Sequence, residues 1–164
     1  ENLFHVLNST LEYSALEAGQ LKLDETEFSL REMLDSTVAA AREKAGAKGL
    51  RLATAFDPSL PETMIGDAAR IRDILLHLLD NAVKFTHKGG ITVTLSRDYD
   101  QLITTVRDTG IGIPLDRQAH IFESFRQVKS SRKRKYESEG LRLSIVYQLL
   151  DLMKGKVTID SEIG

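Results

Sequence analysis

An asparagine and a lysine three residues apart are the first pair in the chain whose types and spacing suggest chemistry. Asn81 and Lys84 lie near the end of a segment with helical apolar periodicity. An amide oxygen is a neutral hard ligand suited to Mg²⁺, and an ammonium group is a point charge for phosphate. Because asparagine is a mediocre helix former, helix propensity does not explain its place. The pair could hold a metal-bound phosphate, and the alternative is an ordinary solvated helix face.

A glycine-containing loop supplies a second candidate site. It comprises Asp108–Pro114, in which Gly110 and Gly112 are two residues apart. Glycines permit positive φ and a close approach of the backbone to a flat ligand. A buried Asp108 at the end of a strand is expected to accept a hydrogen bond from an exocyclic amine such as that of adenine. The loop is not a dinucleotide fingerprint, because no third glycine opens a following helix, and the alternative is a tight turn.

A helix over residues 67–85 must position Asn81 and Lys84. Asp67 is its expected N-cap, and apolar residues at 3.6-residue spacing form its core face. That core face comprises Ile71, Ile74, Leu75, Leu78, Leu79, Ala82 and Phe85. The opposite stripe comprises Arg70, Asp73, His77, Asn81 and Lys84, with Asp80 beside it.

The remaining segments alternate between helical and strand patterns. A helix is expected over residues 1–20, where it serves either as core or as a surface for a partner helix. Further expected elements are a strand over 21–28, a helix from Ser29 to Gly46 with a Ser29–Glu32 capping box, a strand over 50–56, a hairpin over 91–106 turning at Tyr99–Asp100, a helix over 141–153 and a strand at Val157 and Ile159. This order predicts an α+β fold, a two-layer sandwich whose mixed, mostly antiparallel sheet is covered by helices on one face.

Composition narrows the class of protein. The 164 residues include 22 Lys and Arg and 24 Asp and Glu, a net charge of −2 that excludes a protein coating nucleic acid. With no cysteine, disulfide scaffolds and thiolate metal sites are excluded. No apolar run reaches the roughly 18 residues of a membrane span, so we expect a cytoplasmic domain, whose parent protein can still be membrane-anchored.

Taken together and in order, these segments resemble the ATP-binding catalytic domain of two-component sensor histidine kinases, in the GHKL ATPase superfamily. The resemblance covers nearly the whole chain. The matching segments are Leu11–Leu21 (end of the dimerisation hairpin), Gly66–Arg72, Leu78–Thr86 (asparagine motif), Asp108–Ile113 (first glycine motif) and Ile121–Phe125 (phenylalanine motif). The implied domains are residues 1–20, the end of the hairpin's second helix, and residues 21–164, a catalytic domain with its C-terminal segment truncated.

The resemblance implies binding of ATP or ADP with Mg²⁺. Asn81 would be the metal ligand, Lys84 would contact phosphate and Asp108 would take the adenine amino group. The other implied nucleotide-binding residues are Gly110, Gly112, Ile113, Phe122, Gly140 and Leu141, and Phe125 would help Phe122 to anchor a mobile ATP lid. In such sensor or hybrid kinases the γ-phosphate passes to a histidine of a dimerisation domain and then to a response-regulator receiver domain, in a homodimer or in a heterodimer with another kinase.

Three departures from the family pattern keep a second function open. His77 stands where the family has another asparagine, and it is either a catalytic residue or an ordinary surface residue. The second glycine motif is degenerate over Glu137–Leu143, where Glu139 would repel phosphate and Arg142 or the basic run Lys129–Lys135 would attract it. No phosphoacceptor motif is present, so the chain cannot phosphorylate itself. The alternative is a pseudokinase-like module with weak or no ATP binding that regulates a partner kinase by docking.

Overall fold

The computed structural model describes residues 22–118 and 139–163, and these fall into two compact units. The larger unit contains Glu25–Gly112 and residue 163, and the smaller one contains residues 22–24, 113–118 and 139–162 of the described chain. The predicted helix over residues 1–20 and the phenylalanine motif lie outside the described residues.

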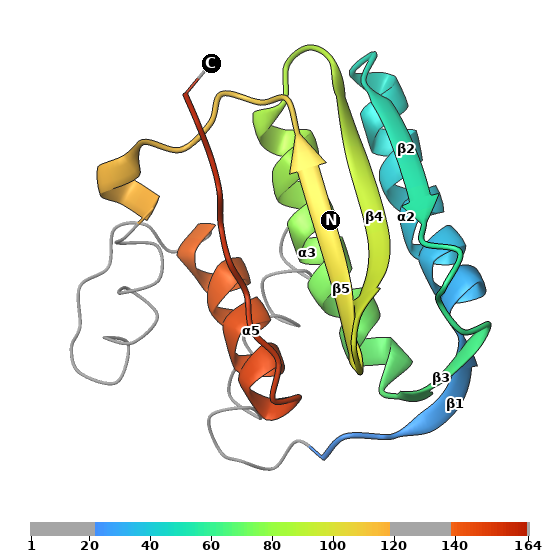
Figure 1. Cartoon of the computed structure of the whole chain (residues 1–164). Helices are drawn as coiled ribbons and strands as arrows, with labels where there is room; N and C mark the ends of the chain where they lie inside the picture. The colour runs from blue at the N-terminus through green and yellow to red at the C-terminus, as the bar shows by residue number, and fades with distance from the viewer. Residues whose placement is uncertain (1–21, 119–138, 164) are drawn as a thin grey trace. The chain divides into compact units, whose positions relative to one another are not determined.

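The larger unit combines two helices with two small sheets (Figure 1). Its elements are β1 (Thr26–Ser29), α2 (Leu30–Ala47), β2 (Arg51–Phe56), β3 (Thr63–Gly66), α3 (Ala68–Phe85), β4 (Gly90–Asp98) and β5 (Gln101–Asp108). Strand β1 pairs antiparallel with β3, while β4 pairs parallel with β2 and antiparallel with β5. Helices α2 and α3 lie side by side on one face of the three-stranded sheet. The predicted α+β two-layer class is confirmed, but the strands form two sheets rather than one.

Both long helices begin at the residues that their capping patterns predict. The Glu32 backbone N–H donates to Ser29 Oγ at 3.3 Å at the start of α2. The Arg70 backbone N–H donates to Asp67 Oδ1 at 3.1 Å at the start of α3. Each side chain thereby satisfies an N–H group that has no partner inside its helix.

The core of the larger unit fills the space between the helices and the three-stranded sheet. Its fully buried residues include Leu34 and Val38 of α2, Leu75 and Leu79 of α3, and Ile91, Val93 and Leu95 of β4. The predicted core face of α3 is partly wrong, because Val83 is also buried whereas Ile71, Ile74, Leu78 and Phe85 are only half-buried. Helix α3 packs against α2 as well as against the sheet. Its buried face therefore includes Val83.

Two predicted strand assignments need correction. The sequence pattern did not indicate β3, whose residues become a strand by pairing with β1 in the register Thr26↔Gly66. The strand expected at Val157 and Ile159 does not form within described residues 155–163. A strand requires a hydrogen-bonded neighbour, and none of the described ladders includes these residues.

The smaller unit contains α5 (Glu139–Leu152), in agreement with the predicted helix over 141–153. Ile145, Val146 and Leu149 form its buried face. The Ile113 backbone N–H donates to Ser161 Oγ at 2.9 Å, which joins the segment after the glycine loop to the segment after α5. Among the described residues, no helix is both long and apolar enough to cross a membrane.

Candidate functional site

The end of α3 and the end of β5 meet at one edge of the larger unit. We call this region the junction, and it consists of residues 83–90 and 108–111. The Ile111 backbone N–H donates to the Phe85 carbonyl at 3.3 Å, and the Thr109 backbone N–H donates to the Gly90 carbonyl at 3.2 Å. The structure therefore brings the asparagine motif and the first glycine motif together, although more than twenty residues separate them in the chain.

Asp108 is held in place by two donors from the junction. Its Oδ1 accepts a hydrogen bond from the Gly110 backbone N–H at 2.8 Å and another from Thr86 Oγ1 at 3.4 Å. Thr86 is fully buried, so its hydroxyl group holds the Asp108 carboxylate from the interior side of the junction. The expectation that Asp108 is buried is wrong: it is exposed, because it is the last residue of β5, the edge strand of its sheet, whose inward-facing residues are only half-buried. An oriented, exposed carboxylate is a suitable acceptor for an exocyclic amine.

The two glycines of the loop are required for different reasons. A Cβ on Gly110 would lie 2.6 Å from Asp108 Oδ1 and 2.7 Å from the Phe85 carbonyl oxygen, so this position has no room for a side chain. Gly112 has φ +70°, a backbone conformation that other residues rarely adopt. The predicted positive φ is thus confirmed at Gly112 but not at Gly110. At Gly110 a glycine is needed because Asp108 and the Phe85 carbonyl lie too close for a side chain.

A second set of contacts ties the loop before β4 to the residue after β5. Thr109 Oγ1 donates to the Lys88 carbonyl at 2.8 Å and accepts from the Gly90 backbone N–H at 3.1 Å. Gly89 has φ +96°, and a Cβ there would collide with Thr109 Oγ1. Neither Thr86 nor Thr109 was singled out from the sequence. Their only signal is their place within the two motifs, directly after the last residue of α3 and of β5.

The last turns of α3 carry the polar side chains predicted to meet a metal-bound phosphate. Asn81 and His77 are half-buried and Lys84 is exposed. Asn81 lies one helical turn, about 6 Å, before Phe85, whose carbonyl is bonded to the glycine loop. Among the residues that the structure describes, no group of three His, Asp or Glu side chains could hold a metal by itself. An amide oxygen at Asn81 fits Mg²⁺ if phosphate and water oxygens complete its coordination.

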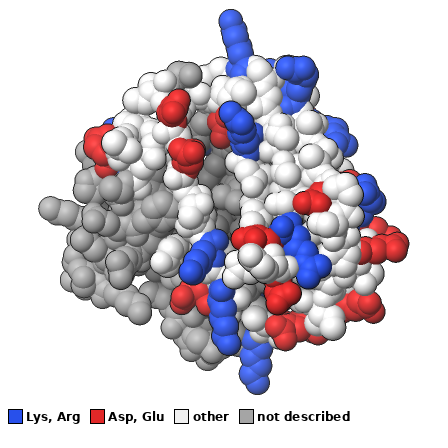
Figure 2. All heavy atoms as spheres, viewed as in Figure 1, with Lys and Arg blue, Asp and Glu red and all other residues white. Residues whose placement is uncertain are grey.

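Basic side chains gather at the end of the larger unit that contains the junction. The exposed Lys and Arg residues of the segments that meet here are Lys48, Arg51, Lys84, Lys88 and Arg107. Figure 2 shows basic side chains at the upper right of the view, with others across its lower centre. The five basic residues near the junction favour the approach of an anion to it.

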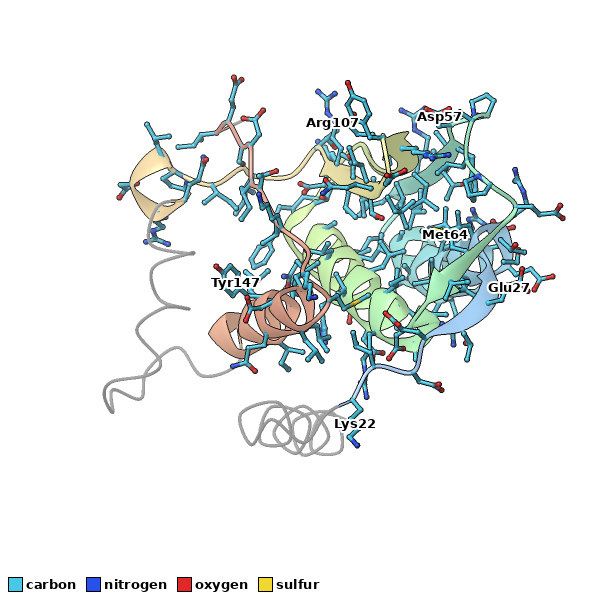
Figure 3. The ribbon with its side chains drawn as sticks, turned by 60° about the horizontal axis from the view of Figure 1, so that its bottom comes forward. Lys22, Glu27, Asp57, Met64, Arg107 and Tyr147 are labelled. Carbon is cyan, nitrogen blue, oxygen red and sulfur yellow. The ribbon has the colours of Figure 1, made fainter. Side chains whose placement is uncertain are left out.

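Two hollows of the larger unit lie away from the junction. One is lined by residues that include Glu27 of β1, and the other by residues that include Met64 of β3. Figure 3 shows Glu27 and Met64 on the β1–β3 sheet, apart from Arg107, which directly precedes Asp108. The candidate site at the junction is separate from these two hollows, and its Lys84 and Asp108 are exposed.

The other predicted site residues lie outside the larger unit. Ile113 belongs to the smaller unit, and Gly140 and Leu141 belong to the first turn of α5. Phe122, Phe125 and the basic run Lys129–Lys135 lie outside the described residues. Their roles in nucleotide binding stay predictions.

Comparisons with known proteins identify the family to which the chain is similar. Residues 66–164 match the family described as "Histidine kinase-, DNA gyrase B-, and HSP90-like ATPase". Signal transduction histidine-protein kinase BarA of Escherichia coli strain K12 is 37% identical over 166 residues, which cover 98% of this chain and 18% of BarA. Hybrid signal transduction histidine kinase B of Dictyostelium discoideum is 36% identical over 167 residues, which cover 99% of this chain and 8% of that kinase.

A solved structure shows the same fold. The crystal structure of full-length ShkA in complex with AMPPNP has a TM-score of 0.85 and 32% identity, covering 99% of this chain and 34% of ShkA. The chain thus spans less than a fifth of each of the two relatives and about a third of ShkA. Because the family model covers more than half of the chain and kinases resemble it over nearly all its length, the chain belongs to the histidine kinase-, DNA gyrase B- and HSP90-like ATPase family, as the catalytic ATP-binding domain of sensor and hybrid histidine kinases.

Proposed function

We propose that the junction binds ATP, and that the chain presents its γ-phosphate to a histidine outside this chain. The observation that carries this proposal is the oriented Asp108 carboxylate beside the end of the helix that bears Asn81 and Lys84. The complex of ShkA with AMPPNP, a nucleotide, supports it by similarity.

The adenine end of the nucleotide is assigned to the glycine loop. Asp108 accepts a hydrogen bond from the adenine amino group, while Gly110 and Gly112 leave the loop without side chains where the flat base approaches. Thr86 and the Gly110 N–H orient the Asp108 carboxylate before the nucleotide binds. The entropy cost of ordering this side chain on binding is therefore small.

The phosphate end is assigned to α3. The Asn81 amide oxygen is the protein ligand for Mg²⁺, and the Lys84 ammonium contacts a phosphate oxygen. When bound, Mg²⁺ neutralises negative charge on the phosphate oxygens, in addition to the positioning of the phosphates by Asn81 and Lys84. Among the further residues proposed from the family resemblance, Ile113, Phe122, Gly140 and Leu141 contribute to binding the nucleotide.

The acceptor and the downstream partner lie beyond this chain. We assign the acceptor histidine to a dimerisation domain and the next acceptor to a response-regulator receiver domain. Histidine kinase ThkA, a solved structural neighbour at 26% identity with a TM-score of 0.60, has been solved in complex with its response regulator TrrA. We assign the domain to the cytoplasm, where ATP is available. The similarities give no support to the alternative of a degenerate regulatory module.

Calorimetric titration with ATP, with and without Mg²⁺, tests both assignments. Asp108→Asn replaces one acceptor oxygen with a donor and should weaken ATP binding by about 10-fold or more, the loss expected for a hydrogen bond to a charged group. Asp98→Asn is the matched control, because Asp98 is exposed at the opposite end of the β4–β5 hairpin.

Asn81→Ala should weaken ATP binding when Mg²⁺ is present and leave it nearly unchanged in excess EDTA. Equal loss in both conditions would contradict the metal assignment. A wild-type chain that binds neither ATP nor ADP would refute the proposed function itself.

A further inference from the structure

We infer that Lys48, the C-cap residue of α2, positions the nucleotide site by holding the last turn of α3 without itself touching the nucleotide. This inference rests on the proposed function of the junction. Lys48 Nζ donates to the Val83 carbonyl at 2.6 Å and to the Lys84 carbonyl at 3.1 Å. Both acceptors lie between Asn81 and the residues that bind the glycine loop.

The sequence Lys48-Gly49-Leu50 determines where this ammonium group lies. The Gly49 backbone N–H donates to the Gly46 carbonyl at 2.9 Å, and the Leu50 backbone N–H donates to the Ala45 carbonyl at 3.0 Å. With Gly49 at φ +70° and Leu50 buried, these bonds form a Schellman motif that ends α2. Lys48 is the C-cap residue, so the motif fixes its backbone next to α3.

The contact acts on backbone carbonyl groups in the last turn of α3. The last four carbonyls of a helix have no intrahelical donor, and the negative end of the helix dipole attracts a cation. Lys48 supplies both a donor and a positive charge at this end. The next carbonyl, that of Phe85, accepts from the Ile111 N–H, and the next residue, Thr86, donates its hydroxyl proton to Asp108. Fixing the turn at Val83 and Lys84 therefore fixes the two groups that hold the glycine loop.

Lys44 offers a natural comparison one helical turn earlier on α2. Its Nζ lies 2.7 Å from Asp80 Oδ1, in an ion pair whose lysine side chain is 60% exposed. It therefore contacts a side chain of α3 rather than the backbone, and a surface pair of this kind contributes little to stability. Replacing either lysine removes one positive charge from the C-terminal end of α2. Only the replacement of Lys48 also removes the hydrogen bonds to the backbone at the end of α3.

The test compares Lys48→Met with Lys44→Met by two measurements. Backbone amide exchange is followed at Thr86 and Ile111, with the fully buried Val93 of β4 as the reference for global unfolding. ATP affinity is measured with Mg²⁺ by calorimetry. We expect Lys48→Met to accelerate exchange at Thr86 and Ile111 by about tenfold more than at Val93 and to weaken ATP binding by about tenfold, the loss of roughly one charge-assisted hydrogen bond.

The controls separate positioning from a general loss of stability or charge. Lys44→Met should leave ATP affinity and the exchange at Thr86 and Ile111 relative to Val93 nearly unchanged. Lys48→Arg, which keeps the charge and the donors, should retain most of the ATP affinity and most of the protection from exchange. The inference is overturned if Lys48→Met and Lys44→Met give the same exchange at Thr86 and Ile111, or if they lower ATP affinity equally. A wild-type chain that binds no ATP refutes the proposed function, and the exchange comparison then decides the role of Lys48 alone.

Discussion

Replacing Gly110 with alanine should damage both the fold and the nucleotide site, because the junction has no space for one methyl group. The new Cβ would lie 2.6 Å from Asp108 Oδ1, 2.7 Å from the Phe85 carbonyl oxygen and 3.1 Å from the Phe85 carbonyl carbon. Ordinary contact begins at 3.4 Å, so the two oxygens are at least 0.7 Å too close. One is a backbone atom at the end of α3, and the other is held by two hydrogen bonds.

The cost follows from what must move. Overpacking of this kind typically costs about 1–3 kcal/mol, and separating the loop from Phe85 also breaks the Ile111–Phe85 hydrogen bond, worth about 0.5–1.5 kcal/mol. We therefore expect the free energy of unfolding to fall by about 2–4 kcal/mol, a large share of the roughly 5–15 kcal/mol typical of a domain. Because Asp108 must turn away from the methyl group, ATP affinity should fall by about tenfold or more.

Urea unfolding and calorimetry with Mg²⁺ and ATP measure the two effects. Gly46→Ala is the matched control, since Gly46 lies inside α2 and a Cβ added there would meet no atom within 4 Å. That variant should gain about 0.4–1 kcal/mol and bind ATP normally. If Gly110→Ala unfolds at the wild-type urea concentration and binds ATP as tightly, then the loop is not packed against Phe85 as described.

Three further predictions concern stability. Leu79→Ala should lower the free energy of unfolding by about 2–5 kcal/mol in urea, since Leu79 is 0% exposed in the core, and a loss under 1 kcal/mol would contradict that packing. Asp67→Ala removes the α3 N-cap and should cost about 0.5–2 kcal/mol, while Asp67→Asn, which keeps an acceptor for the Arg70 N–H, should retain most of the stability. The Ser59 backbone N–H, 2.8 Å from Asp57 Oδ1, holds the pKa of Asp57 below its ordinary value of 3.8. The stability that this carboxylate contributes is therefore present at neutral pH and lost as the pH falls through the lowered pKa. The urea midpoints of wild type and Asp57→Asn should converge once the pH is below that lowered pKa, and a gap that persists after Asp57 is protonated would count against this contact.

Local signals were enough to predict the elements that carry the site. Asp67 predicted where α3 begins, Gly89–Gly90 where it gives way to β4, and Tyr99–Asp100 where the hairpin turns. Each depends on the conformational preference or hydrogen bonding of residues within a few positions of one another. The resemblance to histidine kinases added the roles of Asn81 and Asp108, which spacing alone left open.

Features that depend on distant segments escaped prediction. Strand β3 has four residues and forms by pairing with β1, and the side chains of Thr63 and Glu27 that bond across them are 36 positions apart. The burial of Val83 depends on where α2 packs, and the exposure of Asp108 depends on the place of β5 at the edge of the sheet. None of these follows from periodicity, because each is decided by the neighbour that tertiary structure supplies.

The junction shows why the site depends more on backbone than on side chains. The Phe85 and Gly90 carbonyls and the Thr109 and Ile111 N–H groups form the bonds between α3, β4 and the glycine loop. A side-chain substitution can remove one contact of the nucleotide, but it leaves these bonds intact. A methyl group at Gly110, or a weaker hold on the end of α3, instead shifts the backbone that carries Asp108 relative to the helix that carries Asn81. Because the two ends of the nucleotide are assigned to different elements, their relative placement, and not only the presence of each residue, sets the affinity.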